Sequence, residues 1–159
     1  MIWYVDGACS GNGSVNSKGG YGVIGVSDET PIHAHSHFVE GTTNNREELK
    51  AILYVIINYG VNIKNEDWIE IPVVYSDSAY SVNTLNDWMF KWAKNGWIKS
   101  DKKTPENLDL IQAYYDLYQQ GYRIDLRKIK GLSGQKWNDV ADKLATGVLT
   151  PEAAMEVRY

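Results

Sequence analysis

The sequence begins Met1-Ile2-Trp3-Tyr4-Val5-Asp6-Gly7-Ala8, an apolar run that carries a single carboxylate. Such a run is typical of a buried strand, and a charged side chain within it is costly to bury unless another charge compensates it. A bound cation is the compensation that this position favours. Three further acidic residues, Glu48, Asp77 and Asp142, lie where a strand or helix can bring them to the same point. The four carboxylates therefore predict a cage for divalent metal ions.

Length and composition favour one globular domain. The chain has 159 residues, of which 43% are hydrophobic, so it can bury one substantial core. It contains no run of about 18 apolar residues and no charged-then-apolar leader, so we expect neither a membrane span nor a secretion signal. A single cysteine, Cys9, excludes an internal disulfide and a cysteine-based zinc site. These features predict a monomeric, cytoplasmic protein that does not contact membranes.

The charge distribution points to a different partner than the net charge does. A net charge of −4 argues against nucleic acid, yet ten of the 16 basic residues lie in the windows 91–103 and 123–136. In the first window Trp88, Phe90, Trp92 and Trp97 alternate with lysines, a mixture suited to phosphates and base faces. Solvated charged faces and core tryptophans are the alternatives that the sequence leaves open.

Hydrophobic periodicity and turn signals predict the order of elements. Strands are expected at 2–9, 21–27, 32–39, 68–76 and 122–129, and helices at 43–60, 79–85, 87–94, 104–121 and 137–148. No element is predicted for the tail, residues 150–159. Three strands followed by alternating helices and strands indicate an α/β protein, a mixed sheet with helices on its faces.

Two of the acidic residues can be chosen on local grounds. Asp77 ends the apolar strand 73–76, at the edge where α/β sheets usually bind ligands, although a turn or capping role is the alternative. Glu48 flanks the buried stripe of the first helix, whereas Glu47 lies on a face that should point to water. For the last helix, the same reasoning favours Asp142, which follows the inward-facing Ala141, over Asp139, but periodicity alone makes this choice weaker.

Four stretches carry a resemblance to a known family. They are Asp6-Gly-Ala-Cys-Ser-Gly-Asn12, Thr43-Asn-Asn-Arg-Glu-Glu-Leu-Lys-Ala51, Tyr75-Ser-Asp-Ser-Ala-Tyr80 and Trp137-Asn-Asp-Val-Ala-Asp-Lys-Leu-Ala145. In order and spacing they resemble the signature stretches of type 1 ribonuclease H. The resemblance implies a ribonuclease H-like fold, a five-stranded sheet ordered 3-2-1-4-5, over residues 1–149, and it favours Glu48 and Asp142 over their neighbours.

The same resemblance implies the activity. It indicates an endonuclease that cleaves the RNA strand of an RNA/DNA hybrid with two Mg²⁺ ions, or Mn²⁺ as a substitute, leaving 5′-phosphate and 3′-hydroxyl ends. Asp6, Glu48, Asp77 and Asp142 are its catalytic and metal-binding residues by this resemblance, with Asp6 bridging both ions. Carboxylates suit Mg²⁺, a hard cation that prefers oxygen ligands. A non-catalytic hybrid-binding module and a related DNA-acting nuclease are the competing hypotheses.

Substrate contacts and two unusual features complete the predictions. The resemblance assigns substrate contacts to Asn12, Thr43, Asn44, Asn45, Ser78, Trp88, Lys91, Trp92, Lys94 and Asn138, whereas turn and cap chemistry is the alternative for the asparagines. Leu132 stands where many relatives have a loop histidine, so we expect slower turnover or a substitute role for Gln135 or Lys136. His33, His35 and His37 alternate on one strand face, which we expect to be exposed rather than a metal site.

Overall fold

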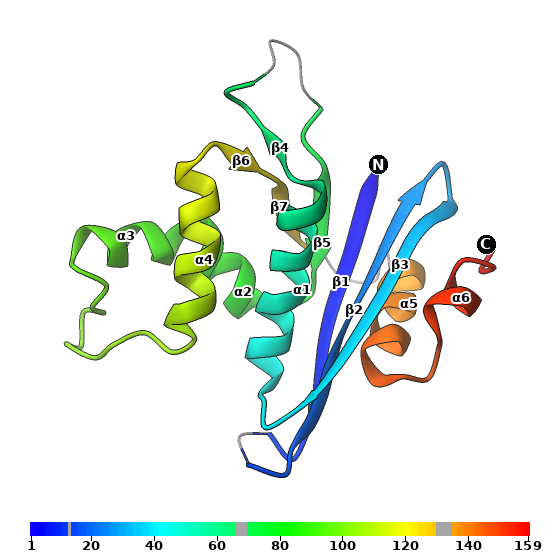
Figure 1. The fold of residues 1–159 in the computed structure, drawn as a ribbon, viewed down its shortest axis with the longest axis horizontal. Helices are drawn as coiled ribbons and strands as arrows, with labels where there is room; N and C mark the ends of the chain where they lie inside the picture. Colours follow the sequence, from blue (N-terminus) through cyan, green and yellow to red (C-terminus); the bar gives the residue numbers. More distant parts are fainter. Residues whose placement is uncertain (13, 66–69, 130–134) are drawn as a thin grey trace.

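The centre of the computed structural model, which describes residues 1–12, 14–65, 70–129 and 135–159, is a five-stranded sheet (Figure 1). Its strands are β1 (Ile2–Ser10), β2 (Lys18–Ser27), β3 (Thr30–Glu40), β5 (Val73–Ser76) and β7 (Asp125–Lys128), in the order β3-β2-β1-β5-β7. The first three form an antiparallel meander, and β5 and β7 continue the sheet in parallel with β1. The predicted α/β class and the strand order 3-2-1-4-5 are confirmed.

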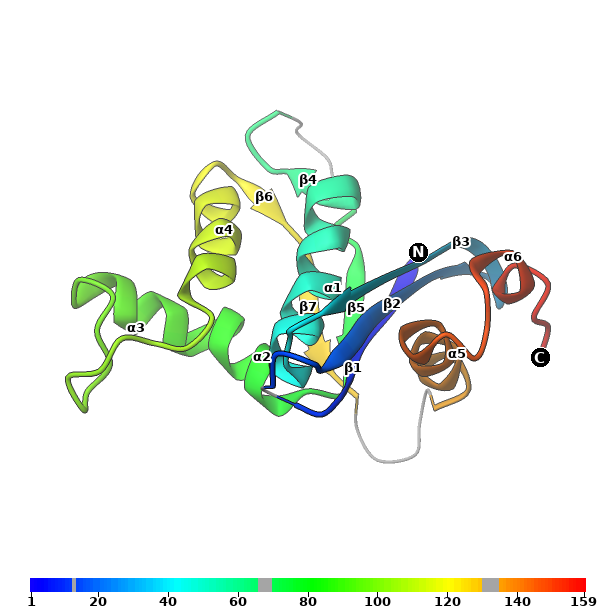
Figure 2. The ribbon, with the colours of Figure 1, turned by 60° about the horizontal axis from the view of Figure 1, so that its bottom comes forward.

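Helices cover both faces of this sheet. Figures 1 and 2 show α1 (Asn44–Tyr59) and α4 (Leu108–Gln119) on one side, and α5 (Gln135–Thr146) with the short α6 (Pro151–Ala154) on the other. Successive side chains of β1 alternate between the two faces, so Trp3 and Val5 pack with α1 while Tyr4 packs with α5. Among the described residues, no helix is both long and apolar enough to cross a bilayer.

A helical arm projects from the α4 side of the molecule. It consists of α2 (Ala79–Asn83), a single π-helical turn η1 (Thr84–Trp88) and α3 (Met89–Lys94), which follow one another without a break. The two helices predicted over 79–94 are therefore one continuous segment whose hydrogen bonding changes at η1. Figure 1 shows α3 farther from the sheet than α4, at the end of the molecule opposite α5 and α6.

A second, two-stranded sheet was not predicted. The strand β4 (Val61–Asn62) pairs with β6 (Tyr122–Arg123), and it divides the single strand expected over 122–129 into β6 and β7. The division arises because β6 pairs with the segment that follows α1, while β7 joins the main sheet beside β5. The strand expected at 68–76 is described only from residue 70, and its regular part is β5.

Two boundaries differ for reasons of backbone conformation. Lys18, Gly19 and Gly20, expected in a loop, belong to β2 because they pair with the end of β1. The helix α4 begins at Leu108 rather than near 104, because Asn107 before it adopts a left-handed conformation with φ 60°.

Candidate active site

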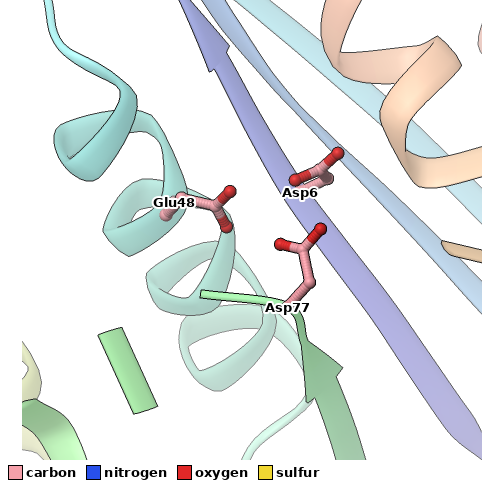
Figure 3. Close-up of side chains that lie close together, drawn as sticks. All are labelled: Asp6, Glu48 and Asp77. Carbon is pink, nitrogen blue, oxygen red and sulfur yellow. The ribbon is translucent and has the colours of Figure 1, made fainter. Parts of the chain in front are cut away.

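The register of two parallel strands brings Asp6 and Asp77 together. The pairing of β1 with β5 runs from Ile2 opposite Val73 to Val5 opposite Ser76. Asp6 is the next residue of β1 and Asp77 directly follows the end of β5, so their carboxylates lie beside each other where β5 ends (Figure 3). This carboxyl end of parallel strands is the edge at which α/β sheets usually bind ligands.

The helix α1 supplies Glu48 from the opposite side. Thr43 caps the helix, since its Oγ1 accepts a hydrogen bond from the Arg46 amide at 3.1 Å. The helix lies so close to β1 that a Cβ atom at Gly7 would be 2.4 Å from the Glu48 nitrogen. Glu48 therefore faces the two aspartates (Figure 3), and one ligand oxygen from each of the three residues lies within 4.8 Å of the others.

Asp142 reaches the same cleft from α5. That helix packs on β2 at Gly22, the residue paired with Asp6, where a Cβ atom would be 2.3 Å from the carbonyl oxygen of Ala141. The exposed Asp142 lines one open cleft with Asp6, Glu48 and Asp77. It lies outside the tight group of three. Asp139 on the same helix does not line the cleft.

Burial and crowding perturb these acids in the absence of a cation. Burial first, and then the neighbouring Glu48 carboxylate, raises the pKa of Asp6 to about 10. Burial also raises the pKa of Glu48, while a hydrogen bond shared with Asp6 acts against that rise. Both shifts oppose ionisation of the two acids together, so a bound charge of opposite sign would favour the doubly ionised pair.

The donor set fits a hard divalent cation. All ligand atoms in the group are carboxylate oxygens, and Oε2 of Glu48 is buried with no hydrogen-bond partner among the described residues. Oxygens within 4.8 Å of one another can share one ion, or two ions about 3.5 to 4 Å apart. The acidic triad is consistent with a metal site, as the sequence predicted.

Several predicted substrate contacts line a second depression beside the first. Asn12, Thr43, Asn44 and Asn45 lie around it, and Asn44 and Asn45 also line the carboxylate cleft. Oδ1 of Asn12 accepts a hydrogen bond from the Asn44 amide at 2.8 Å, so turn chemistry explains part of its role.

Sequence reasoning missed the far wall of this depression. Glu106 and Asn107 form this wall, and the depression as a whole has a volume of about 550 Å³. Asn107 is held there by Arg46, whose Nη1 donates to its side-chain oxygen at 3.3 Å and whose guanidinium grips Asp109 at 3.0 and 2.9 Å. A lone Asn before a helix carries no signal for this contact, which joins segments about sixty residues apart.

Ser78 and Asn138 lie at the edge of the carboxylate group. Ser78 lines the cleft and caps α2 by accepting a hydrogen bond from the Ser81 amide at 3.1 Å. Asn138, on α5, donates to Oδ2 of Asp77 at 3.5 Å. Their predicted contact with substrate stays a prediction, and both have a local structural partner.

The remaining predicted contacts lie on the helical arm. Trp88 is 38% exposed and its ring centroid lies 6.2 Å from that of the half-buried Trp92. Lys91 and Lys94 are exposed on α3, and Lys91 pairs with Asp87 at 3.5 Å. The arm thus presents cations and aromatic faces together, while the nearby Trp97 packs against Tyr115 as a core residue would.

The expectation that Glu47 points to water is wrong. Its side chain is completely buried, because Gly7 and Gly19 leave room for it between α1 and the strands β1 and β2. Helical periodicity did not reveal this, since the space is provided by two glycines on other elements.

The histidine face also differs from expectation. His33 and His35 are half-buried, and only His37 of the three is exposed. Nε2 of His33 is 2.7 Å from the Tyr54 hydroxyl, and the ring of His35 stacks on Tyr54 with centroids 4.1 Å apart. Within the described ranges, the three histidines form no group with metal-binding spacing. The predicted loop feature at Leu132 lies outside the described residues, as does the side chain of Gln135.

Comparison with known proteins assigns the family. The RNase H family pattern matches residues 1–149. The chain belongs to the RNase H family. A Ribonuclease H of Syntrophomonas wolfei is 38% identical to this chain, over 94% of this chain and 95% of its own length. A Ribonuclease H of Chlorobaculum parvum is also 38% identical, over 89% of this chain and 90% of its own length. As an RNase H family member, the chain is a nuclease of the ribonuclease H class.

Solved structures support the fold. LC9-RNase H1, described as a type 1 RNase H with the type 2 active-site motif, superposes with a TM-score of 0.70 at 25% identity, over 99% of this chain and 73% of that one. The foamy viral protease-reverse transcriptase in complex with RNA/DNA hybrid gives a TM-score of 0.75 at 19% identity, over 98% of this chain and 20% of that one, and so shows the fold alone.

Proposed function

We propose that the cleft hydrolyses the RNA strand of RNA/DNA hybrids with two bound divalent cations, leaving 5′-phosphate and 3′-hydroxyl ends. The observation that carries the proposal is the convergence of Asp6, Glu48 and Asp77 within 4.8 Å at an open cleft, in a chain of the RNase H family. Mg²⁺ is the proposed ion, because the ligands are all hard oxygens, and Mn²⁺ is its proposed substitute.

Each carboxylate has a role in this proposal. Asp6 would help to hold both ions, Glu48 and Asp77 would hold one of them, and Asp142 would help to hold the other. When bound, the pair of ions stabilises the attacking and leaving oxygens of an in-line displacement at phosphorus. The chain contributes the fixed spacing of four carboxylates, which β1, α1, α5 and the end of β5 carry. Binding of the cations has to overcome the raised pKa of Asp6.

Two neighbouring depressions support a two-stranded substrate. Asn44 and Asn45 separate the carboxylate cleft from the depression lined by Asn12 and Asn107. Side-chain amides between two strands can meet base edges and the 2′-hydroxyl that distinguishes RNA from DNA. The lysines and tryptophans of the helical arm would then contact the other strand.

The decisive experiment is a comparison of substrates. We expect cleavage of labelled RNA/DNA hybrid with Mg²⁺ or Mn²⁺, loss of cleavage with EDTA, and little cleavage of matched RNA duplex, DNA duplex or single-stranded RNA. Tight hybrid binding without any cleavage would favour the binding-module alternative. Cleavage of DNA duplex alone would favour a DNA-acting nuclease and overturn the proposal.

The loop at Leu132 provides a second test, of turnover. If the absence of a histidine there slows product release, Leu132→His should raise the steady-state rate by more than it raises the single-turnover rate. Lys136→Ala and Gln135→Ala, measured in the same two assays, test whether either residue takes the role of the missing histidine. No change in either rate for Leu132→His would remove this hypothesis.

We also propose a monomeric protein of the cytoplasm. Its single cysteine suits a reducing compartment, and light scattering would test whether it is a monomer.

A further inference from the structure

Glu47 is a buried charge that the proposed chemistry does not use. It precedes Glu48 on α1, yet its side chain has an exposed fraction of 0% and lies between the start of α1 and the strands β1 and β2. A buried carboxylate is costly unless it is paired and hydrogen-bonded. Its contacts therefore indicate what it stabilises.

Two groups compensate the charge. Oε2 of Glu47 accepts a hydrogen bond from Oγ1 of Thr42 at 2.7 Å and pairs with Nζ of Lys50 at 2.9 Å. Oε1 is buried with no partner among the described residues. The Lys50 side chain is 25% exposed, so the pair is screened from water on most sides. This carboxylate joins the helix to Thr42, the residue before its cap.

Thr42 in turn joins the segment before α1 to the first two strands. Its amide donates to Oγ of Ser17 at 2.8 Å, and that hydroxyl donates back to the Thr42 carbonyl at 2.9 Å. The same carbonyl accepts from Sγ of Cys9 at 3.4 Å. Glu47, Thr42 and Ser17 therefore form a buried chain of contacts from α1 to the start of β2.

Glycines permit the approach that this chain of contacts holds in place. A Cβ atom at Gly7 would be 2.7 Å from the Glu47 carbonyl carbon, and one at Gly19 would be 2.5 Å from Cγ2 of Thr42 and 3.3 Å from Cγ of Glu47. Because Gly7 follows Asp6 and Glu47 precedes Glu48, this contact lies beside the two buried ligands.

We propose that Glu47, through Thr42 and Lys50, is a positioning residue that sets the separation of Glu48 from Asp6 and thereby the affinity of the site for divalent cations. The alternative is an ordinary buried ion pair, whose loss would lower stability without a selective effect on metal binding. The inference rests on the metal site of the proposed function, and it adds a residue that itself touches neither metal nor substrate.

The test is metal binding without substrate. Glu47→Gln keeps the shape and an acceptor for Thr42 but removes the charge that pairs with Lys50. In calorimetric titrations with Mg²⁺ and Mn²⁺ we expect its dissociation constant to rise about ten-fold, the lower end of the effect seen when groups that orient metal ligands are removed. In hybrid cleavage, the metal concentration for half-maximal rate should rise by a similar factor, while the KM for hybrid changes little and kcat recovers at high metal.

Matched variants separate positioning from stability. Thr42→Val keeps the side-chain shape but removes the hydroxyl, so it should weaken metal binding more than Thr42→Ser, which keeps it. Ile111→Val, at a fully buried position of α4, should lower the melting temperature without changing metal affinity. If Glu47→Gln does not fold, the two Thr42 variants provide the same comparison.

The outcomes are distinguishable. Wild-type protein that neither binds nor requires divalent cations would overturn the proposed function itself. If the wild type binds Mg²⁺ while Glu47→Gln and Thr42→Val titrate like it, or shift no more than Ile111→Val, then only the positioning role fails.

Discussion

At the scale of single residues, Asp6 is the carboxylate whose burial and acidic neighbours most destabilise the metal-free fold. Its exposed fraction is 5%, and Glu48 and Asp77 lie within metal-binding distance of it. Without a cation these like charges repel, and burial together with the Glu48 carboxylate raises the pKa of Asp6. The residue is therefore essential for binding metal and unfavourable for the stability of the metal-free fold.

Asp6→Asn should separate these two effects. We expect hybrid cleavage to fall to background, because the bridging carboxylate is removed, and the melting temperature in EDTA at neutral pH to stay equal or rise. A gain of about 1 kcal/mol would raise it by about 2 to 4 °C. Asp139→Asn, outside the cleft on α5, is the control and should retain cleavage. A variant at position 6 that cleaves at the wild-type rate would remove the assignment.

Gly22 matters because it has no side chain. It pairs with Asp6 and allows the backbone of α5 to approach β2. Gly22→Ala should therefore displace the helix that carries Asp142, with a decrease of about 1 to 3 kcal/mol in the free energy of unfolding and a fall in cleavage rate. Chemical denaturation and hybrid cleavage measure the two effects. Ile111→Val, which lowers stability far from the cleft, is the control, and equal falls in activity for both variants would contradict the idea.

At the scale of elements, the contact of β3 with α1 is an aromatic layer built around two histidines. Burial lowers the pKa of His33, and burial together with its histidine neighbours lowers the pKa of His35. Tyr21, Tyr54 and Tyr59 face these rings from β2 and α1, with the Tyr21 hydroxyl 3.5 Å from His35 and the Tyr59 hydroxyl 3.1 Å from His33. The layer therefore favours neutral imidazoles.

This layer should make stability fall in mild acid. The unfolded chain takes up protons near its ordinary histidine pKa of about 6.5, whereas the native histidines resist protonation until a lower pH. The stabilisation is complete above that pKa and disappears as pH falls through the native values. His35→Phe keeps a ring against Tyr54 but cannot titrate, so its melting temperature should drop less than that of the wild type between about pH 7 and about pH 5.5. Equal drops would contradict the prediction.

At the scale of the whole molecule, net charge and local charge oppose each other. The chain carries −4 overall, yet its helical arm carries the exposed residues Trp88, Lys91 and Lys94, none of which lines the acidic cleft. A polyanionic substrate would be held by the arm while its scissile phosphate meets the carboxylates and their cations. Substitutions in the arm should therefore weaken hybrid binding without changing the rate of the cleavage step.

The double variant Lys91→Ala/Lys94→Ala tests that separation. We expect weaker hybrid binding, and a salt dependence of binding whose slope falls by about 0.7 to 0.9 for each phosphate that the protein no longer neutralises. The single-turnover rate at saturating hybrid should change little, because neither lysine lines the carboxylate cleft. Lys64→Ala, beside β4, is the control for removal of positive charge. An unchanged salt slope would contradict a role of the arm in binding.

Much of this architecture follows from the sequence itself. The apolar run of β1, the cap at Thr43 and the end of α1 at Gly60 are local signals, and they predicted the strand and the helix because nearby residues determine those conformations. The strand order was predicted from the resemblance to type 1 ribonuclease H, since strand order depends on contacts between distant segments. Acidic residues at a strand end and on a helix flank likewise predicted the metal-binding triad, since register and periodicity fix their direction.

Other features depended on contacts between distant segments. The burial of Glu47 requires space left by Gly7 and Gly19, and the half-burial of His33 and His35 requires the tyrosines of α1 and β2. The placement of Asn107 requires Arg46. Local pattern specifies which face of an element is apolar, but only the tertiary structure decides what fills the space against that face. For this protein, sequence determined which acids converge, and packing across the sheet decided how closely they do so.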